Sequence, residues 1–157
     1  MGTTRTGRGK TFMRDQNKIL VQRFFDEVFN NARPGAIDEL IADDYLDHSA
    51  TPEQAPGPTG ARQMHDVFRT AFPDLRVTVH EMLAEGDFVA CRTTFAGTSR
   101  GPLMGAPPTG KPVQLSSMVF LRLRNGKIVE RWEQADLLGL MLQLGIVTQG
   151  DNSGDPQ

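Results

Sequence analysis

The chain has 157 residues, 38% of them hydrophobic and 23% charged, with a formal net charge of −2. This length suits one domain with its own core, and the composition is ordinary for a soluble globular protein. No apolar run approaches the roughly 20 residues that cross a bilayer, so we expect no membrane partner. Residues 1–14 hold four basic and no acidic side chains, which leaves a net charge of −6 for the rest. An acidic body argues against binding nucleic acid, which needs a basic face.

Both ends of the chain lack a core pattern. Residues 1–16 are predicted to be a flexible N-terminal tail, and without an apolar segment they do not resemble a secretory signal, so we expect a cytoplasmic protein. Residues 148–157 are rich in Gly, Asn, Asp, Ser and Pro and are predicted to be a flexible C-terminal tail. The domain is therefore expected to span residues 17–147.

Three helices are predicted in the first half of the domain. Apolar residues recur at helical spacing in residues 17–30, and a shorter helix begins near Pro34 and ends before Tyr45. A loop rich in Pro and Gly follows at residues 52–60. A third helix then ends before Pro73, which cannot continue it. Its apolar side is formed by Met64, Val67, Phe68, Ala71 and Phe72.

Strands are predicted from residue 77 onward. Residues 77–83 and 88–98 are rich in β-branched and apolar side chains and form a first hairpin. The loop at residues 99–110 contains two bulky apolar residues, Leu103 and Met104, so it either folds over a pocket or is held on the surface by Met104. Helices followed by antiparallel strands predict an α+β domain.

A second hairpin joins residues 113–124 to residues 127–134. Its Asn125-Gly126 turn favours positive φ at both central positions, which is typical of a type I′ turn. Counting back from this turn predicts that Val119 faces Trp132 and Ser117 faces Gln134, on one side of the sheet. Asp136 continues that side, before a short apolar helix at residues 137–144 that Gly145 closes.

The predicted face carries one candidate acid–base group, Asp136. A carboxyl group beside apolar surface can both take and return a proton near neutral pH. The alternative is that Asp136 caps the following helix. His48 follows Tyr45 in a polar segment and either hydrogen-bonds near a pocket mouth or is satisfied by backbone groups. His65 and His80 are expected at the surface.

The sequence contains no motif typical of nucleotide binding, nucleophilic catalysis or metal binding. There is no P-loop, no nucleophile elbow, no dinucleotide fingerprint and no His or Cys pair at metal-ligand spacing, so we expect no cofactor and no metal. The lone cysteine, Cys91, lies in an apolar strand pattern and is expected to be a buried structural thiol.

Several segments in order resemble the SnoaL-like polyketide cyclases: residues 23–30 (RFFDEVFN), 37–48 (IDELIADDYLDH), 68–79, 105–113 and 125–145 (NGKIVERWEQADLLGLMLQLG). The resemblance implies a cone-shaped α+β barrel of the nuclear transport factor 2-like superfamily, with N-terminal helices packed on a curved antiparallel sheet. It also implies that the outer sheet face is used for oligomer contacts, so a homo-oligomer, a dimer or tetramer, is expected.

The resemblance further implies that Asp136 and His48 are catalytic, in a cofactor-free intramolecular aldol condensation. The expected substrate is a small apolar or aromatic polyketide-like molecule. Relatives often carry histidine where this chain has Ser99 and Arg131. The alternatives are hydroxylation, epoxide opening, or a non-catalytic binding protein of the same fold. Residues predicted to bind the substrate are Tyr45, Met64, Met104, Val119, Trp132 and Gln134.

Overall fold

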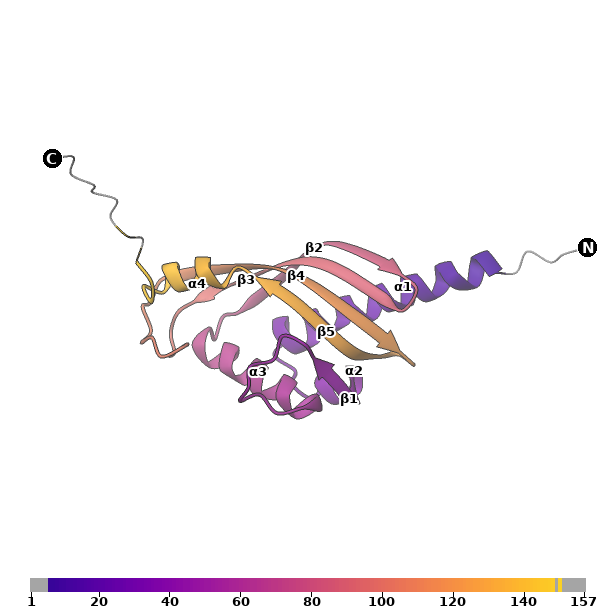
Figure 1. Ribbon diagram of the computed structural model, residues 1–157, viewed down its shortest axis with the longest axis horizontal. Helices are drawn as coiled ribbons and strands as arrows, with labels where there is room; N and C mark the ends of the chain where they lie inside the picture. Colours follow the sequence, from indigo (N-terminus) through magenta and orange to yellow (C-terminus); the bar gives the residue numbers. More distant parts are fainter. Residues whose placement is uncertain (1–5, 149, 151–157) are drawn as a thin grey trace, which may run out of the picture.

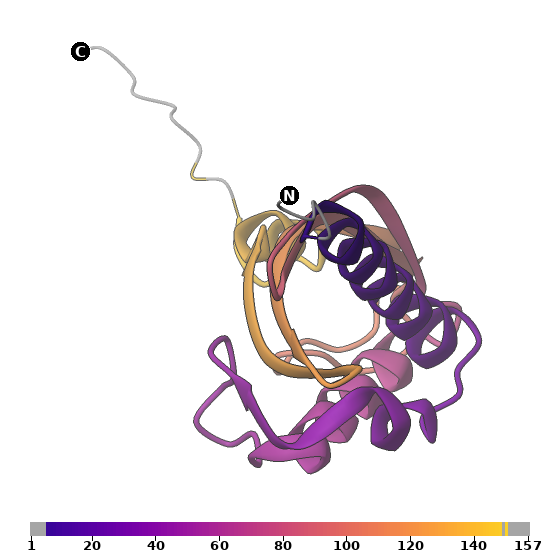
Figure 2. The ribbon, with the colours of Figure 1, turned by 90° about the vertical axis from the view of Figure 1, so that its right-hand side faces the viewer.

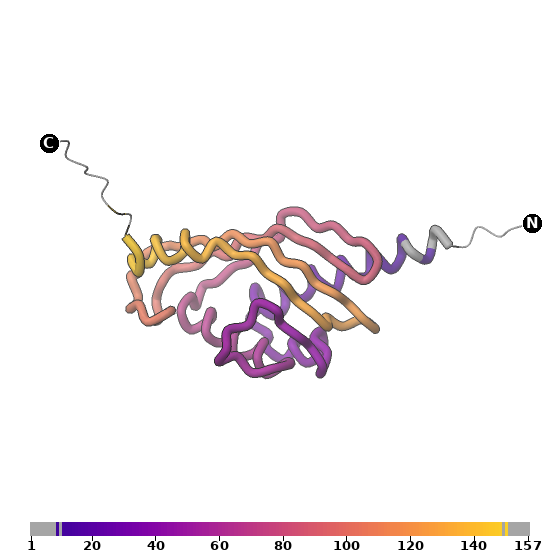
Figure 3. The backbone as a smooth tube through the Cα atoms, in the orientation of Figure 1, coloured from indigo at the N-terminus to yellow at the C-terminus, as the bar shows by residue number. Residues whose placement is uncertain are grey.

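The computed structural model describes residues 6–148 and residue 150, and its centre is one curved sheet (Figures 1 and 3). The five strands are β1 (Ile41–Asp47), β2 (Arg76–Glu85), β3 (Phe88–Thr98), β4 (Pro112–Arg124) and β5 (Lys127–Ala135), in the spatial order β1-β5-β4-β3-β2. The helices are α1 (Thr6–Phe24), the π-helix η1 (Phe25–Asn30), α2 (Ala36–Leu40), α3 (Gly57–Ala71) and α4 (Leu137–Gln143). The α+β prediction is confirmed.

The sheet bends over the helices and forms a cone. Figure 2 looks along it: the strands form the curved wall, α1 crosses one side and α3 lies beneath. Every second residue of β4 is buried on the inner face, which is the period-2 pattern of a half-buried strand. Burying each large apolar side chain stabilises the fold by roughly 1.5–3 kcal/mol. The β4 residues buried on this face are Val113, Leu115, Ser117, Val119, Leu121 and Leu123.

The sheet is neither closed nor purely antiparallel. The parallel strand is β1, which the sequence pattern did not reveal. Ile41 ends α2 with extended backbone (φ −109°, ψ 135°), and the chain then runs parallel to β5, with Asp47 opposite Arg131. A register irregularity between Ile41 and Leu46 disrupts the alternation of buried and exposed residues in β1. Since β1 and β2 are not paired with each other, the cone has two open edges.

The N-terminal helix is longer than expected. It begins at Thr6, so residues 6–16, predicted to be a flexible tail, are helical, and an ion pair of 2.7 Å joins Arg14 to Glu85 at the end of β2. Residues 1–5 of that tail lie outside the described residues, as do residues 149 and 151–157 of the predicted C-terminal tail. None of the helices in the described part of the chain is long and apolar enough to span a membrane.

The β4–β5 hairpin has the predicted turn but not the predicted register. Asn125 and Gly126 have φ of 51° and 73°, and Leu123 pairs with Ile128 as expected. The next pair joins Arg122 to Glu130, because a bulge takes up one extra residue in β5. A one-residue shift moves every following side chain to the other face of the sheet. The predicted pairing beyond Ile128 is therefore wrong.

The curved sheet packs tightly on the helices at Gly97 of β3. An added Cβ there would lie 2.8 Å from Cβ of Phe72, at the end of α3. Gly97→Ala is therefore expected to lower the free energy of unfolding by about 1–3 kcal/mol, the usual cost of overpacking a core. Gly35→Ala is the matched control, since nothing lies within 4 Å of its added Cβ. Urea denaturation checks this, and equal midpoints for the two variants would contradict it.

Candidate functional site

A buried group of charged side chains, here called the Arg131 cluster, lies on the inner face of the sheet; it comprises Tyr45 and Asp47 of β1 with Arg131 and Glu133 of β5. Nη1 of Arg131 donates to Oδ2 of Asp47 at 3.0 Å, and Nη2 donates to Glu133. The side chains of Arg131, Asp47 and Glu133 are 14%, 6% and 15% exposed. Burying charges is costly unless they are paired and hydrogen-bonded, as they are here.

The electrostatics of the cluster keep Arg131 charged and Tyr45 neutral. Burial alone would lower the pKa of Arg131, but the carboxylates of Glu133 and Asp47 outweigh burial and raise that pKa. Burial raises the pKa of Tyr45 above its ordinary value, although the nearby guanidinium of Arg131 opposes the change. Tyr45 can therefore donate a hydrogen bond in the cone without ionising.

The two carboxylates of the cluster differ in how fully they are hydrogen-bonded. Oδ1 of Asp47 accepts from the backbone N–H of Ser49 at 2.9 Å, and Oδ2 accepts from Gln54 at 3.3 Å as well as from Arg131. Glu133 accepts only through Oε2, from Arg131, and its Oε1 has no hydrogen-bond donor among the described residues. One carboxylate is thus saturated and the other has a free oxygen.

A histidine predicted to lie at the surface is buried instead. The side chain of His65 is on the inner side of α3, in line with Ala61, Phe68 and Phe72 at helical spacing. Its Nδ1 lies 2.9 Å from Oδ1 of Asp66, and its Nε2 is buried with no hydrogen-bond partner among the described residues. The buried face of α3 is turned by about one residue from the predicted face, so the surface prediction for His65 is wrong.

Asp136 lies outside the Arg131 cluster. It is the N-cap of α4, where its Oδ1 accepts from the backbone N–H of Gly139 at 2.9 Å, and its side chain is exposed. A Cβ at Gly139 would collide with this carboxylate, so the glycine permits the close approach. The capping alternative is confirmed, and the catalytic role of Asp136 stays a prediction.

His48 and Trp132 come together, but on the outer face of the sheet. Their rings stack at 4.4 Å, and Nε2 of His48 lies 2.9 Å from Oε2 of Glu130. Trp132 also contacts the ring of Phe120 on β4. The bulge in β5 places Trp132 and Gln134 opposite Phe120 and Met118, away from Val119. The prediction that Val119, Trp132, Gln134 and Asp136 share one inner face is therefore wrong.

The other residues predicted to bind substrate are dispersed. Tyr45 belongs to the Arg131 cluster, whereas Met64 is half-buried on α3. Met104 is exposed in a tight turn with φ of 52°, and its neighbour Leu103 is buried. The loop at residues 99–110 is thus anchored through Leu103 rather than through Met104.

Cavities open on the outside of the cone. One of about 480 Å³ lies over the outer face of β3, β4 and β5, where Val119, Trp132 and Gln134 contribute to its lining beside Leu83 and Met118. Inside the cone, at the α4 end, a cavity bounded by apolar side chains holds only about 10 Å³, so this end is filled. The residues around that small cavity are Phe68, Phe72, Leu75, Phe95, Ala96, Gly97, Val113, Leu115 and Leu140.

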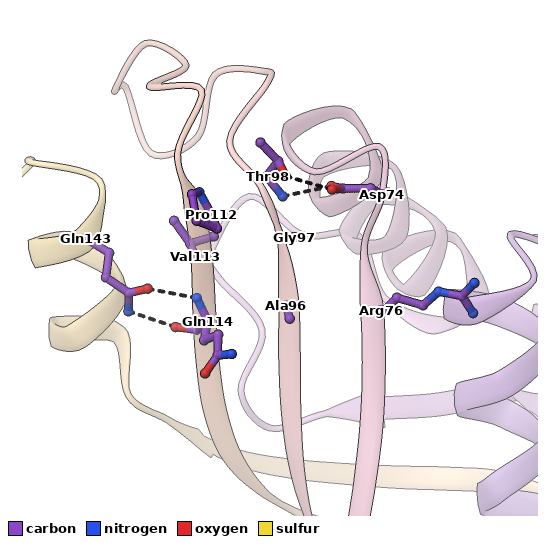
Figure 4. A pocket seen from close by; sticks show the side chains of 9 residues that line it. All are labelled: Asp74, Arg76, Ala96, Gly97, Thr98, Pro112, Val113, Gln114 and Gln143. Atoms are coloured by element: carbon purple, nitrogen blue, oxygen red, sulfur yellow. Dashed lines mark hydrogen bonds between the residues drawn. The ribbon is translucent and has the colours of Figure 1, made fainter.

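A further surface cavity, of about 700 Å³, lies where α4 meets the sheet (Figure 4). Its polar groups are largely bound to one another: the side-chain amide of Gln143 bonds the backbone N–H and C=O of Gln114, and Asp74 accepts from the N–H and hydroxyl of Thr98. Figure 4 shows Arg76 pointing away from the other labelled side chains. This cavity therefore presents few free polar groups to a ligand.

In the described part of the chain, no three His, Cys, Asp or Glu side chains are arranged to hold a metal ion. The chemistry that the Arg131 cluster itself can provide is proton transfer by a carboxylate, hydrogen bonding by a phenol, and stabilisation of negative charge by a guanidinium.

A model of one protein family matches most of this chain. The match is to the SnoaL-like polyketide cyclases and extends over residues 19–144. The chain belongs to the SnoaL-like polyketide cyclase family. It is 30% identical over 120 residues to nogalonic acid methyl ester cyclase from Streptomyces nogalater, an alignment that covers 74% of this chain and 89% of the relative. Family membership and this relative support a cyclase-like enzymatic role.

Solved structures agree with this assignment. IdmH from Streptomyces antibioticus, a candidate polyketide cyclase, is 32% identical with a TM-score of 0.71, over 83% of this chain and 99% of IdmH. AclR from Streptomyces galilaeus, a candidate hydroxylase, is 27% identical with a TM-score of 0.76, over 87% of this chain and 85% of AclR. The fold of this SnoaL-like protein is therefore shared by proteins assigned to different reactions.

The buried thiol of Cys91 gives a test of how well the inner face excludes water. Burial raises the pKa of Cys91 to about 12, and the nearby Glu133 acts in the same direction. At pH 8 the reactive thiolate should be about a thousandfold rarer than for an ordinary cysteine, so iodoacetamide should leave the folded protein unmodified. The same reagent should label Cys91 fully in urea. Labelling of the folded protein at the rate of a free thiol would contradict this burial.

Proposed function

We propose that this protein catalyses cofactor-free ring closure of a small polyketide-like substrate by an intramolecular aldol reaction inside the cone. The observation that carries the proposal is the Arg131 cluster: the inner face of the sheet holds a carboxylate with a free oxygen beside a buried guanidinium. Removing a proton from a carbon between carbonyl groups needs a base, and the enolate formed needs a nearby positive charge.

Membership of the cyclase family supports this reaction class, and the relative acting on nogalonic acid methyl ester suggests the substrate. The first experiment incubates the purified protein, without added metal or cofactor, with nogalonic acid methyl ester. The aldol product has the mass of the substrate but a different retention time and absorbance. Formation of that product supports the proposal, and an unchanged substrate contradicts it.

A hydroxylase function is the second candidate, because AclR shares the fold. The same experiment separates the two, since hydroxylation adds one oxygen atom to the mass and epoxide opening adds one water. Binding without any product would favour a non-catalytic protein. We further propose that the reaction takes place in the cytoplasm.

The position of Asp136 leads to a specific prediction. Asp136→Ala removes the N-cap of α4 and should lower the free energy of unfolding by about 0.5–2 kcal/mol, whereas Asp136→Asn can still cap and should not. Asp136→Asn also tests the predicted catalytic role of Asp136, because the amide can still cap but cannot take a proton: turnover at the normal rate would leave Asp136 as a helix cap only. A loss of about 10²–10⁴-fold, the usual contribution of a general base, would instead assign the proton transfer to Asp136.

We also propose that a second copy of the chain covers the outer face of the sheet. Leu83, Met118 and Phe120 are 73%, 60% and 44% exposed there, and Phe120 contacts Phe88 and Trp132. Contiguous apolar surface of this kind is typical of an interface. The surrounding charges are already paired within one chain, as in the contact of Arg92 with Glu81, so they do not repel an identical face.

Charge placed on this face should prevent the pairing. In light-scattering measurements at micromolar concentration, the unmodified protein and Ile19→Lys should be dimeric, and Met118→Lys should be monomeric. Ile19 is the control because it is an exposed apolar residue of α1, away from the sheet face. A monomeric unmodified protein, or a dimeric Met118→Lys variant, would contradict the proposal.

A further inference from the structure

We propose that the C-terminal segment of this chain, residues 148–157, docks over the cavity of about 700 Å³ beside α4, here called the α4 cavity. Asp151 and Asp155 of the segment pair there with Arg76 and Arg100. This inference concerns an interaction surface, and it does not depend on the proposed aldol function.

The α4 cavity lies on the outer face of the sheet. Arg76 of β2, Ala96 of β3 and Gln114 of β4 are cross-strand neighbours, and the adjoining row of residues on these strands is buried on the inner face. Because the side chain of Ala96 is a single methyl group, the sheet surface is hollow between Gln114 and Arg76 (Figure 4). A hollow that crosses three strands and opens outward can take a stretch of extended chain.

Two arginines at the cavity have no partner in the described part of the chain. Arg76 lines the cavity, Arg100 lies close to Asp74 of the same lining, and neither guanidinium forms a hydrogen bond or ion pair with a described residue. The oxygens of Asp74 accept from the N–H and the hydroxyl of Thr98. These hydrogen bonds, and to a smaller extent the charge of Arg100, lower the pKa of Asp74. An acidic segment would complement the two unpaired guanidinium groups.

The C-terminal segment is acidic and begins beside the cavity. Residues 148–157 contain two acidic residues and no basic residue. The N–H of Val147 donates to the C=O of Met141 at 3.4 Å, within one helical turn of the cavity residue Gln143. An extended chain gains up to about 3.5 Å per residue, so Asp151 can lie about 14 Å from Val147, whereas β2 is about 10 Å from β4 across the sheet. The segment is therefore long enough to reach the arginines.

The chain's own segment suits the cavity better than a second copy of the outer face does. A tethered segment has an effective concentration in the ~mM range, so even weak, exposed ion pairs can hold it. An identical face would instead bring the same unpaired arginines and no acid to match them. The docked segment would cover the end of the outer face beside α4 and leave the patch around Met118 and Phe120 to the second copy.

Paramagnetic relaxation measured by NMR locates the segment. A nitroxide attached through Ser153→Cys should react at that position alone, because Cys91 is buried. In the full, ¹⁵N-labelled chain, the amide signals of Ala96 and Gln114 should lose most of their intensity. The amide signal of Leu46, in β1 at the far edge of the sheet, should keep its intensity.

Charge reversal tests the ion pairs. Arg76→Glu combined with Arg100→Glu should restore the lost signals, and the variant should fold because both side chains are exposed and unpaired among the described residues. Arg62→Glu, which changes an exposed arginine of α3, is the matched control and should leave the broadening unchanged. Adding Asp151→Lys and Asp155→Lys to the reversed arginines should bring the broadening back. Salt at about 1 M, where the screening length is ~3 Å, should weaken docking of the natural segment.

Each outcome supports or overturns the inference. Broadening that is absent from Ala96 and Gln114, or that survives reversal of both arginines, overturns it. A mixture of nitroxide-bearing chain without ¹⁵N and ¹⁵N-labelled chain without nitroxide identifies the source of the segment. Broadening in that mixture would show docking on a second copy and would overturn docking on the same chain. Broadening that requires both labels on one chain, and that the reversed arginines abolish, supports the proposal.

Discussion

The parallel pairing of β1 with β5 is the contact on which the candidate site depends. It sets Asp47 opposite Arg131, so that a carboxylate and a guanidinium group from segments far apart in the sequence share one buried face. Neither charge would be tolerated there alone, because an unpaired buried charge costs several kcal/mol. The pairing also brings Tyr45 to the guanidinium. The charged cluster and the edge of the sheet are therefore one structural unit, and a change in either would disturb the other.

The bulge in β5 determines which side chains of this strand point into the cone and which lie on the outer face of the sheet. With it, Arg131 and Glu133 enter the cone, while Trp132 joins the aromatic residues of the outer face. Without it, the two faces would be exchanged: an indole would lie in the core, and two buried charges would lie on the apolar surface. One extra residue thus separates a reactive interior from a face suited to contact with another molecule.

Much of the fold could be predicted from the sequence, because periodicity reports which residues are buried. The helical face around Phe24 and Phe25 and the turn at Asn125-Gly126 follow directly from local pattern and backbone preference.

The site could not be predicted in the same way. A bulge leaves no signature in composition, so counting from the turn assigned β5 to the wrong face. The strand β1 has no regular alternation of buried and exposed residues. His65 lies at the edge of the apolar face predicted for α3, so a rotation of that face by one residue position decides whether His65 is buried. The alternation of Arg131 and Glu133 with Trp132 was the available signal for two charges on one strand face.

The side chain of Gln143 covers an unpaired edge of the sheet at the start of β4. β5 ends at Ala135, opposite Ser117, so the first residues of β4 have no neighbouring strand on that side. Gln143 satisfies both backbone groups of Gln114 there, much as a strand residue would. An extended segment of another polypeptide approaching this position finds its hydrogen-bonding groups already engaged. A single amide on a seven-residue helix thereby protects the sheet from templating aggregation at this point.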